Sequence, residues 1–273
     1  MENNRNTIKT IDATHYENGS IIEYNQDVIR EEPLLITVEG SPYSIVMRTP
    51  GDEIAHAAGF CFSEGLIDIP EDIAAMGYCS DLDENSVTIK IVDSRKVLVS
   101  NLLGRQGFLS QTSCGICGRD MIDDLVGNLK VIEDESWISY SQVLLCIDKF
   151  FRHQEYYNRT RGAHAVMLFD RDFNIIRKAE DVGRHNAMDK SIGNLFLSKK
   201  LDDIRLAVLS SRISFEMIQK AARAQIPILI SLSNPTSMAV ELALELNMTL
   251  VSLDKNNNKS GFMVTCGEKR IKI

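Results

Sequence analysis

The chain has 273 residues, 44% of them hydrophobic, and carries 30 basic against 38 acidic side chains. This length can bury two moderate cores, so we expect a globular protein with domains at residues 1–135 and 136–273. A net charge of −8 repels phosphate backbones and disfavours broad nucleic-acid binding. The N-terminus lacks the apolar core of a signal peptide, and no apolar run approaches membrane-spanning length. We therefore expect a cytoplasmic protein without membrane insertion.

After a polar leader, the first half of the chain predicts a hairpin, a helix and a further strand. Apolar and β-branched residues around Gly40-Ser41 predict strands at 34–39 and 43–48. Residues 49–52 open a helix whose apolar positions recur at helical spacing, with Gly65 as its C-cap. Alternation at residues 87–91 predicts a half-buried strand. Four glycines within residues 104–118 indicate a loop, and helix-forming residues follow at 119–129.

The second half alternates between strand and helix patterns after a polar interval at 133–141, which is the predicted domain boundary. Strands are predicted at residues 163–169, 175–179, 206–209, 228–232, 249–253 and 262–265. Helices are predicted at residues 142–154, 185–197, 214–224 and 237–246. Such alternation is typical of an α/β domain with helices on both faces of a sheet. We expect an α+β protein overall, with a smaller α+β domain followed by a three-layer α/β/α domain.

Two of the six cysteines, Cys114 and Cys117, form a Cys-x-x-Cys pair just ahead of a predicted helix. The others stand singly in apolar or strand-like surroundings, where a reducing compartment leaves them as small buried hydrophobes. These four are Cys61, Cys79, Cys146 and Cys266. Any cysteine chemistry is therefore predicted at the pair.

The spacing of the pair allows a metal site, a redox disulfide, a sulfur carrier or no role at all. Zinc needs four ligands, and the sequence has no second Cys-x-x-Cys. A thioredoxin-like motif should follow the first strand of its fold, whereas more than a hundred residues precede Cys114. A persulfide carrier needs an exposed thiolate of low pKa on a mobile loop. The loop glycines, the Arg119 guanidinium and the helix N-terminus suit that requirement. We favour a carrier and expect no metal.

Polar residues gather in the segment 180–190, Glu-Asp-Val-Gly-Arg-His-Asn-Ala-Met-Asp-Lys, around a strand-to-helix turn. Arg184, His185 and Asn186 fall at the predicted helix N-terminus, where free N–H groups suit an anion such as phosphate. The alternative is helix capping with surface salt bridges, in which Asp189 and Lys190 are simply solvated.

Two further polar turns follow neighbouring predicted strands, at residues 210–212 and 233–236. Turns at the carboxyl ends of strands in an open α/β sheet form ligand crevices. The hydroxyls, Arg212 and two helix N-termini could therefore cradle a pyrophosphate, although ordinary N-capping explains each turn separately. His164, at the start of a predicted strand, would by itself more often be a satisfied core histidine than a catalyst.

Taken together, these motifs resemble the FdhD family of formate dehydrogenase accessory sulfurtransferases. The resemblance runs over most of the chain from about residue 30, and Glu-Asp-Val-Gly-Arg-His-Asn-Ala at 180–187 is its most specific part. The matching segments are residues 113–118, 161–164, 180–190, 210–212 with Glu216, and 233–239.

The resemblance implies that a cysteine desulfurase loads sulfur onto Cys114 as a persulfide, while Cys117 assists or resolves. The sulfur would pass to bis-molybdopterin guanine dinucleotide, the molybdenum cofactor used by formate dehydrogenase. The resemblance also implies a second domain similar to the cytidine deaminase fold, and it leaves a homodimer open. The alternatives are a non-catalytic cofactor-binding chaperone and a zinc-dependent deaminase-like enzyme, whose His-x-Glu and Pro-Cys-x-x-Cys signature this chain lacks.

In the family, a segment after the strand at 249–253 contacts the cofactor, commonly beginning with an aromatic residue and ending with a basic one. By position the segment comprises Leu253, Asp254, Lys255, Asn256, Asn257 and Asn258. Here its ends are leucine and asparagine, and about two extra residues precede Phe262, so the chain departs from the family pattern. The asparagine amides could still hydrogen-bond a guanine or a phosphate.

Overall fold

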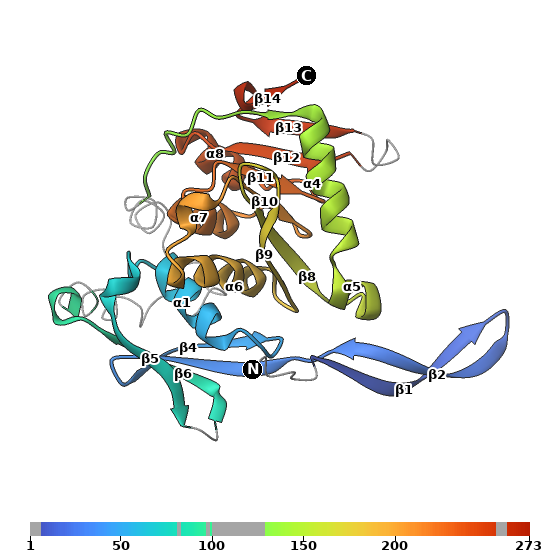
Figure 1. Ribbon diagram of the computed structural model, residues 1–273. Helices are drawn as coiled ribbons and strands as arrows, with labels where there is room; N and C mark the ends of the chain where they lie inside the picture. Colours follow the sequence, from blue (N-terminus) through green and yellow to red (C-terminus); the bar gives the residue numbers. More distant parts are fainter. Residues whose placement is uncertain (1–6, 81–82, 97–98, 100–128, 255–260) are drawn as a thin grey trace.

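The computed structural model describes residues 7–80, 83–96, 99, 129–254 and 261–273 (Figure 1). In this part of the chain the strands form a four-stranded sheet, a six-stranded sheet and two two-stranded ribbons. Cys114 and Cys117 lie outside the described residues, as do the helix predicted at 119–129 except for Leu129, and residues 255–258.

A long hairpin occupies much of the predicted polar leader, so that prediction was wrong for residues 8–29. Strands β1 (Ile8–Glu17) and β2 (Ser20–Ile29) pair antiparallel, and both turn residues, Asn18 and Gly19, have positive φ. Asn-Gly is a strong hairpin signal because both residues tolerate this backbone conformation. The hairpin extends away from the rest of the molecule (Figure 1), so most of its side chains are exposed, including the large apolar ones of Tyr16, Ile21 and Tyr24.

The four-stranded sheet contains β3 (Glu32–Val38), β4 (Ser41–Arg48), β5 (Ile73–Ser80) and β6 (Asp83–Ile91), in the order β4-β3-β6-β5. The predicted hairpin is confirmed, since β3 and β4 pair around Glu39 and Gly40. Helix α1 (Glu53–Ser63) follows, and Gly65 beyond its end adopts φ 77°, as predicted for a helix C-terminus. The short helix η1 (Pro70–Asp72) leads into β5.

The six-stranded sheet is built from the six predicted strands of the second half. They are β8 (His164–Phe169), β9 (Ile175–Asp181), β10 (Leu206–Leu209), β11 (Ile228–Ser231), β12 (Thr249–Leu253) and β13 (Phe262–Cys266). Their order is β13-β12-β11-β10-β8-β9. β10, β11 and β12 are parallel, and the other neighbours are antiparallel. The central strands β10 and β11 are buried throughout because helices cover both faces, and all their residues but Ser231 are apolar.

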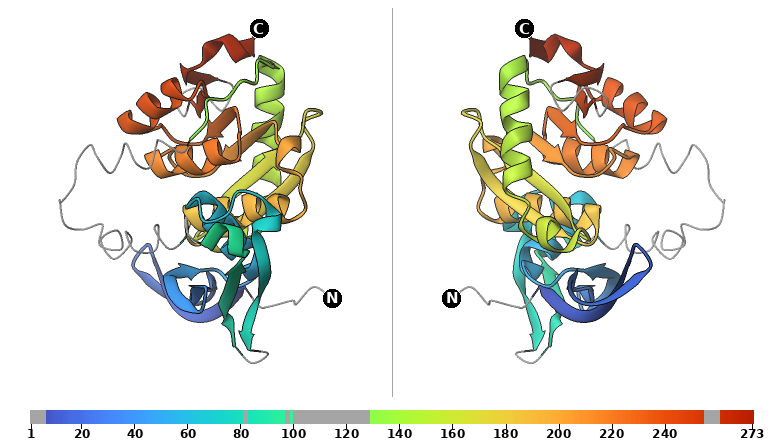
Figure 2. Two further views of the ribbon diagram at one scale, coloured as in Figure 1. Left: turned by 90° about the vertical axis from the view of Figure 1, so that its left-hand side faces the viewer. Right: turned by 90° about the vertical axis from the view of Figure 1, so that its right-hand side faces the viewer.

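Helices lie on both sides of this sheet, which confirms the predicted three layers (Figures 1 and 2). One face packs against α4 (Tyr140–Arg152), and the other against α6 (Arg184–Leu197), α7 (Phe215–Arg223) and α8 (Ser237–Glu245). The remaining short elements are α5 (Glu155–Thr160), η2 (Leu201–Asp203), η3 (Glu268–Arg270), and the paired strands β7 (Ile138–Ser139) and β14 (Ile271–Lys272).

Helices α1 and α6 cross at two glycines, Gly59 and Gly193. A Cβ added to Gly59 would lie 1.9 Å from the backbone oxygen of Asp189, and one added to Gly193 would lie 1.8 Å from that of Ala55. Only glycine permits this backbone approach. One apolar cluster consequently runs from Leu34 through α1 and α6 to the six-stranded sheet. The domain boundary between residues 135 and 136 stays a prediction.

Among the helices described, none combines the length and the apolar character needed to cross a bilayer.

Candidate functional site

The motif expected to bind an anion, residues 180–190, is largely buried. Asp181 and Lys190 form an ion pair at 2.7 Å, and both also bind the backbone of Thr49. Asn186 donates from its side-chain amide to Asp181 and to a backbone carbonyl of β4. These contacts join the end of β4 to the start of α6, so this part of the motif is structural.

Asp189 forms a second buried ion pair, with Lys220 on α7. The Lys220 ammonium lies 2.8 and 2.9 Å from the two carboxylate oxygens of Asp189, and the Ser63 hydroxyl of α1 donates to the same carboxylate at 3.0 Å. Burial opposes the charge of Lys220, but Asp189 and Glu216 raise its pKa above the ordinary value. Asp189 and Lys190 are 1% and 2% exposed, so the interpretation of these residues as solvated was wrong. The Asp189–Lys220 pair ties α1, α6 and α7 together.

A different set of side chains lies at one edge of the six-stranded sheet. The carboxyl end of β10 and the amino end of β8 meet there, because these strands are antiparallel. We call this set the polar edge; it consists of His164, Arg184, His185, Ser210 and Glu216. They come from β8, the start of α6, the turn after β10 and α7. The polar edge therefore brings together residues from four separate segments.

The Ser210 hydroxyl contacts the His164 imidazole. Its hydroxyl oxygen accepts the backbone N–H of Ala165 at 2.9 Å and lies 3.1 Å from Nδ1 of His164. Burial and the charge of Arg184 lower the pKa of His164, although Asp181 opposes them. Ser210 and Nδ1 of His164 therefore share one hydrogen bond, in which either group can be the donor.

The second imidazole of the polar edge is also neutral. Burial, followed by the charges of Arg184 and Lys220, lowers the pKa of His185 to about 3. Its Nε2 lies 3.3 Å from a carboxylate oxygen of Glu216. Near neutral pH, Arg184 therefore supplies the positive charge while the two imidazoles supply hydrogen-bonding groups.

Several buried polar atoms at this edge have no hydrogen-bond partner among the described residues. They are Nε of Arg184 and the hydroxyls of Ser214, which precedes α7, and Ser252, near the end of β12. Buried polar groups are normally satisfied by protein or by bound molecules. A guanidinium, hydroxyls and neutral imidazoles suit a polar, negatively charged ligand such as a nucleotide phosphate.

The pyrophosphate cradle expected from residues 210–212 and 233–236 is largely engaged within the protein. Ser211 donates to the Arg212 carbonyl, and Thr236 accepts from the Ala239 N–H as the N-cap of α8. Helix N-capping therefore explains the role of Thr236, as the alternative to a pyrophosphate cradle predicted. Sequence reasoning missed Ser231, whose hydroxyl donates to the Ser211 carbonyl at 2.7 Å and ties the two turns together. A polar residue ending the apolar run Ile-Leu-Ile-Ser was the available signal.

Only the first two residues of the expected cofactor segment are described. Leu253 ends β12, and its side chain is buried in the core shared with α4. Asp254 donates its backbone N–H to the Gly261 carbonyl at 3.0 Å. Because β10, β11 and β12 are parallel, the segment starts at the same end of the sheet as the polar edge. Lys255, Asn256, Asn257 and Asn258 lie outside the described residues.

Three single cysteines are buried as predicted. Burial raises the pKa values of Cys61, Cys146 and Cys266, that of Cys146 to about 12. These thiols are poor nucleophiles because the reactive form is the thiolate. In the described part of the chain, no three His, Cys, Asp or Glu side chains are grouped to hold a metal.

Fold and site together define an α/β protein whose main sheet carries a cluster of polar side chains where its parallel strands end. The FdhD/NarQ family model matches residues 29–272, and the chain belongs to this family.

Relatives from distant organisms agree with this assignment. A protein of Streptomyces avermitilis named sulfur carrier protein FdhD is 35% identical over 93% of this chain and 92% of its own length. One of the same name from Sulfolobus acidocaldarius is 31% identical over 92% and 94%. A crystal structure from Desulfotalea psychrophila, described as a formate dehydrogenase accessory protein, has a TM-score of 0.76 and 20% identity. It covers 97% of this chain and 100% of that one, and shows the shared fold.

Proposed function

We propose that this protein is a sulfur carrier in the maturation of formate dehydrogenase, acting as a sulfurtransferase through Cys114. Membership of the FdhD/NarQ family over residues 29–272 carries the proposal, together with the name sulfur carrier protein FdhD borne by the relatives. The burial of Cys61, Cys146 and Cys266 adds support, because it leaves these thiols unsuited to the task.

The proposed loading step needs no external oxidant. The Cys114 thiolate attacks the outer sulfur of a persulfide on a cysteine desulfurase. A new S–S bond forms on Cys114, the S–S bond of the donor breaks, and the desulfurase cysteine leaves as a thiolate. The acceptor substrate is the molybdenum cofactor, bis-molybdopterin guanine dinucleotide. Cys117 assists the release or resolves the persulfide: its thiolate attacks Sγ of Cys114, the persulfide S–S bond breaks, and the outer sulfur leaves as sulfide for the cofactor. The two electrons come from the cysteine pair, which becomes a disulfide.

The polar edge is the proposed binding site for that acceptor. The charge of Arg184 and the unpartnered hydroxyls of Ser214 and Ser252 suit the phosphates of a guanine dinucleotide. The neutral imidazoles of His164 and His185 can hydrogen-bond without adding charge. The segment 253–258 starts at the same end of the sheet and is proposed to complete the site.

Loading of Cys114 can be measured directly. After incubation with a desulfurase and cysteine, mass spectrometry should find one added sulfur atom on the Cys114 peptide of the wild-type protein. A Cys114→Ser variant should lose the addition, and Cys146→Ala serves as the control because that thiol is buried. An unmodified wild-type peptide, under conditions that load a known acceptor, contradicts the proposal.

Function in cells separates sulfur transfer from the alternative of a non-catalytic cofactor chaperone. In a cell lacking its own accessory protein, Cys114→Ser should fail to restore formate dehydrogenase activity, whereas Cys146→Ala should restore it. A chaperone that only shields and delivers the cofactor would work without either loop cysteine. Full rescue by Cys114→Ser would therefore favour the chaperone. Sulfur loading and transfer would take place in the cytoplasm, where this protein would encounter both the desulfurase and the immature formate dehydrogenase.

A further inference from the structure

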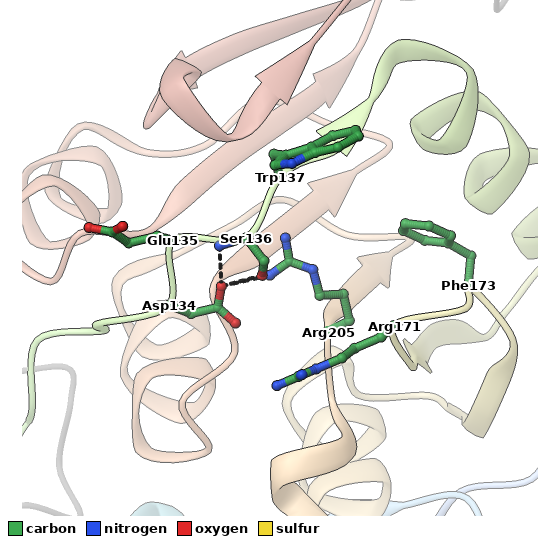
Figure 3. A pocket seen from close by; sticks show the side chains of 7 residues that line it. All are labelled: Asp134, Glu135, Ser136, Trp137, Arg171, Phe173 and Arg205. Carbon is green, nitrogen blue, oxygen red and sulfur yellow. Dashed lines mark hydrogen bonds and ion pairs between the residues drawn. The ribbon is translucent and has the colours of Figure 1, made fainter.

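A polar pocket lies at the end of the six-stranded sheet opposite the polar edge. Arg171 comes after the end of β8 and Arg205 just before the start of β10, so both are opposite the polar edge. The pocket has a volume of about 500 Å³, within the range of small-molecule sites. Figure 3 shows its lining residues: Asp134, Glu135, Ser136, Trp137, Arg171, Phe173 and Arg205. Neither the sulfur chemistry nor the polar edge uses any of them.

The surroundings of the pocket are basic, although the chain as a whole is acidic. Besides the two lining arginines, Arg270 donates to the Asp134 carbonyl, and Lys272 lies over the Trp137 ring with its Nζ 4.2 Å from the ring centroid. Lys149 donates to the Phe173 carbonyl. The lining itself holds two cations, Arg171 and Arg205, and two carboxylates, Asp134 and Glu135; three further cations, Lys149, Arg270 and Lys272, contact lining residues. This imbalance attracts anions.

The hydrogen-bond acceptors around Arg205 do not satisfy all the N–H donors of its guanidinium group. Its residue is 3% exposed, Nη1 lies 3.1 Å from a carboxylate oxygen of Asp134, and Nη2 is buried with no acceptor among the described residues. The same Asp134 oxygen also accepts from the backbone N–H and the hydroxyl of Ser136. A buried charged donor without an acceptor is costly, and a bound oxyanion would remove that cost.

We propose that this pocket binds a phosphate group, with Arg171 and Arg205 as its ligands. Guanidinium groups suit phosphate because their parallel N–H donors match its oxygens. Arg171 is exposed and meets the anion first, whereas Arg205 lies deeper beside Ser136 (Figure 3). Trp137 is 50% exposed beside them and offers a flat apolar face. The phosphate can be free or carried by a nucleotide whose base stacks on that indole.

The pocket carries its own reporter, because Trp137 is the only tryptophan of the chain. The full-length protein is titrated with inorganic phosphate and, separately, with AMP, while sodium chloride keeps the ionic strength constant. Trp137 fluorescence and binding heat are followed in parallel. We expect saturable binding in both measurements. Tighter binding of AMP identifies a nucleotide, and equal or weaker binding of AMP identifies free phosphate; both results support the phosphate site.

Variants assign the binding to the pocket. Arg171→Met removes one charge-assisted contact from an exposed position, and should weaken phosphate binding by about tenfold or more. Arg205→Lys keeps the charge but loses the second donor group, and should weaken binding in the same direction. Arg152→Met is the matched control, because Arg152 is exposed at the far end of α4 and pairs with Asp148.

The proposal is overturned if neither probe gives saturable fluorescence or heat. It is also overturned if Arg171→Met binds as tightly as the wild type, or if chloride alone reproduces the signal. Since Cys114→Ser should bind phosphate unchanged, failure here is distinguishable from failure of the sulfur-carrier proposal.

Discussion

Replacing Gly59 by alanine should destabilise the protein strongly, even though alanine favours helices. In an ordinary helix this substitution gains about 1 kcal/mol. Here the new Cβ would lie 1.9 Å from the Asp189 carbonyl oxygen, whereas real Cβ contacts stay beyond 3.0 Å. Helices α1 and α6 must therefore separate by about 1 Å, which disturbs close-packed core on both sides. We expect a net loss of about 3 kcal/mol in the free energy of unfolding.

The assay is chemical denaturation, with Gly77→Ala as the matched control. Gly77 lies in β5, and a Cβ added there meets no atom within 4 Å. That variant should stay within about 0.5 kcal/mol of the wild type. If Gly59→Ala is as stable as the wild type, the glycine crossing does not hold the helices as the structure indicates.

Two further predictions concern buried charge. Lys220→Met leaves the buried carboxylate of Asp189 without its partner and should lower the free energy of unfolding by about 3–5 kcal/mol. Adding Asp189→Asn should recover part of this loss. A loss below about 1 kcal/mol for Lys220→Met would contradict the prediction. Burial, then Lys190, Lys220 and Arg48, hold the pKa of His56 well below the ordinary value, so below about pH 6.5 the unfolded chain binds a proton that the folded chain does not. The contribution of His56 to the free energy of unfolding should therefore be complete above that pH and fall below it, by up to about 1.4 kcal/mol per pH unit. His56→Gln should make the free energy of unfolding less dependent on pH in this range. An unchanged dependence would refute the role of His56.

The sheet of the second half was predictable because its strands are short apolar runs bounded by turns, as in Ile228–Ser231. Strand β5 was missed because its central sequence, Ala-Ala-Met-Gly-Tyr, shows no alternation of apolar and polar residues. Its pairing with β6 places it in the sheet. The β1–β2 hairpin was missed for a different reason. Its side chains are mostly exposed, so burial leaves no pattern, and Asn18-Gly19 was the remaining signal.

Only those site residues whose position follows from the local strand and helix pattern could be predicted from the sequence. Arg184 and His185 follow a strand and open a helix, and the structure places both at the polar edge. The burial of Asp189 could not be read from its neighbours in sequence, because its partners Ser63 and Lys220 are 126 and 31 residues away. The same limit applies to His164, whose hydrogen-bond partner Ser210 is 46 residues away in the sequence.

The contacts between the end of β4 and the start of α6 have a consequence for synthesis on the ribosome. Thr49 binds Asp181 across 132 residues, and at about 5–20 residues per second that interval takes on the order of ten seconds. Until α6 emerges, the side of α1 that carries Gly59 lacks the helix against which it packs in the folded protein. We expect the nascent chain to depend on chaperones during this interval. The segment that contains β4 and α1 should reach its native packing only after Gly193 has left the exit tunnel.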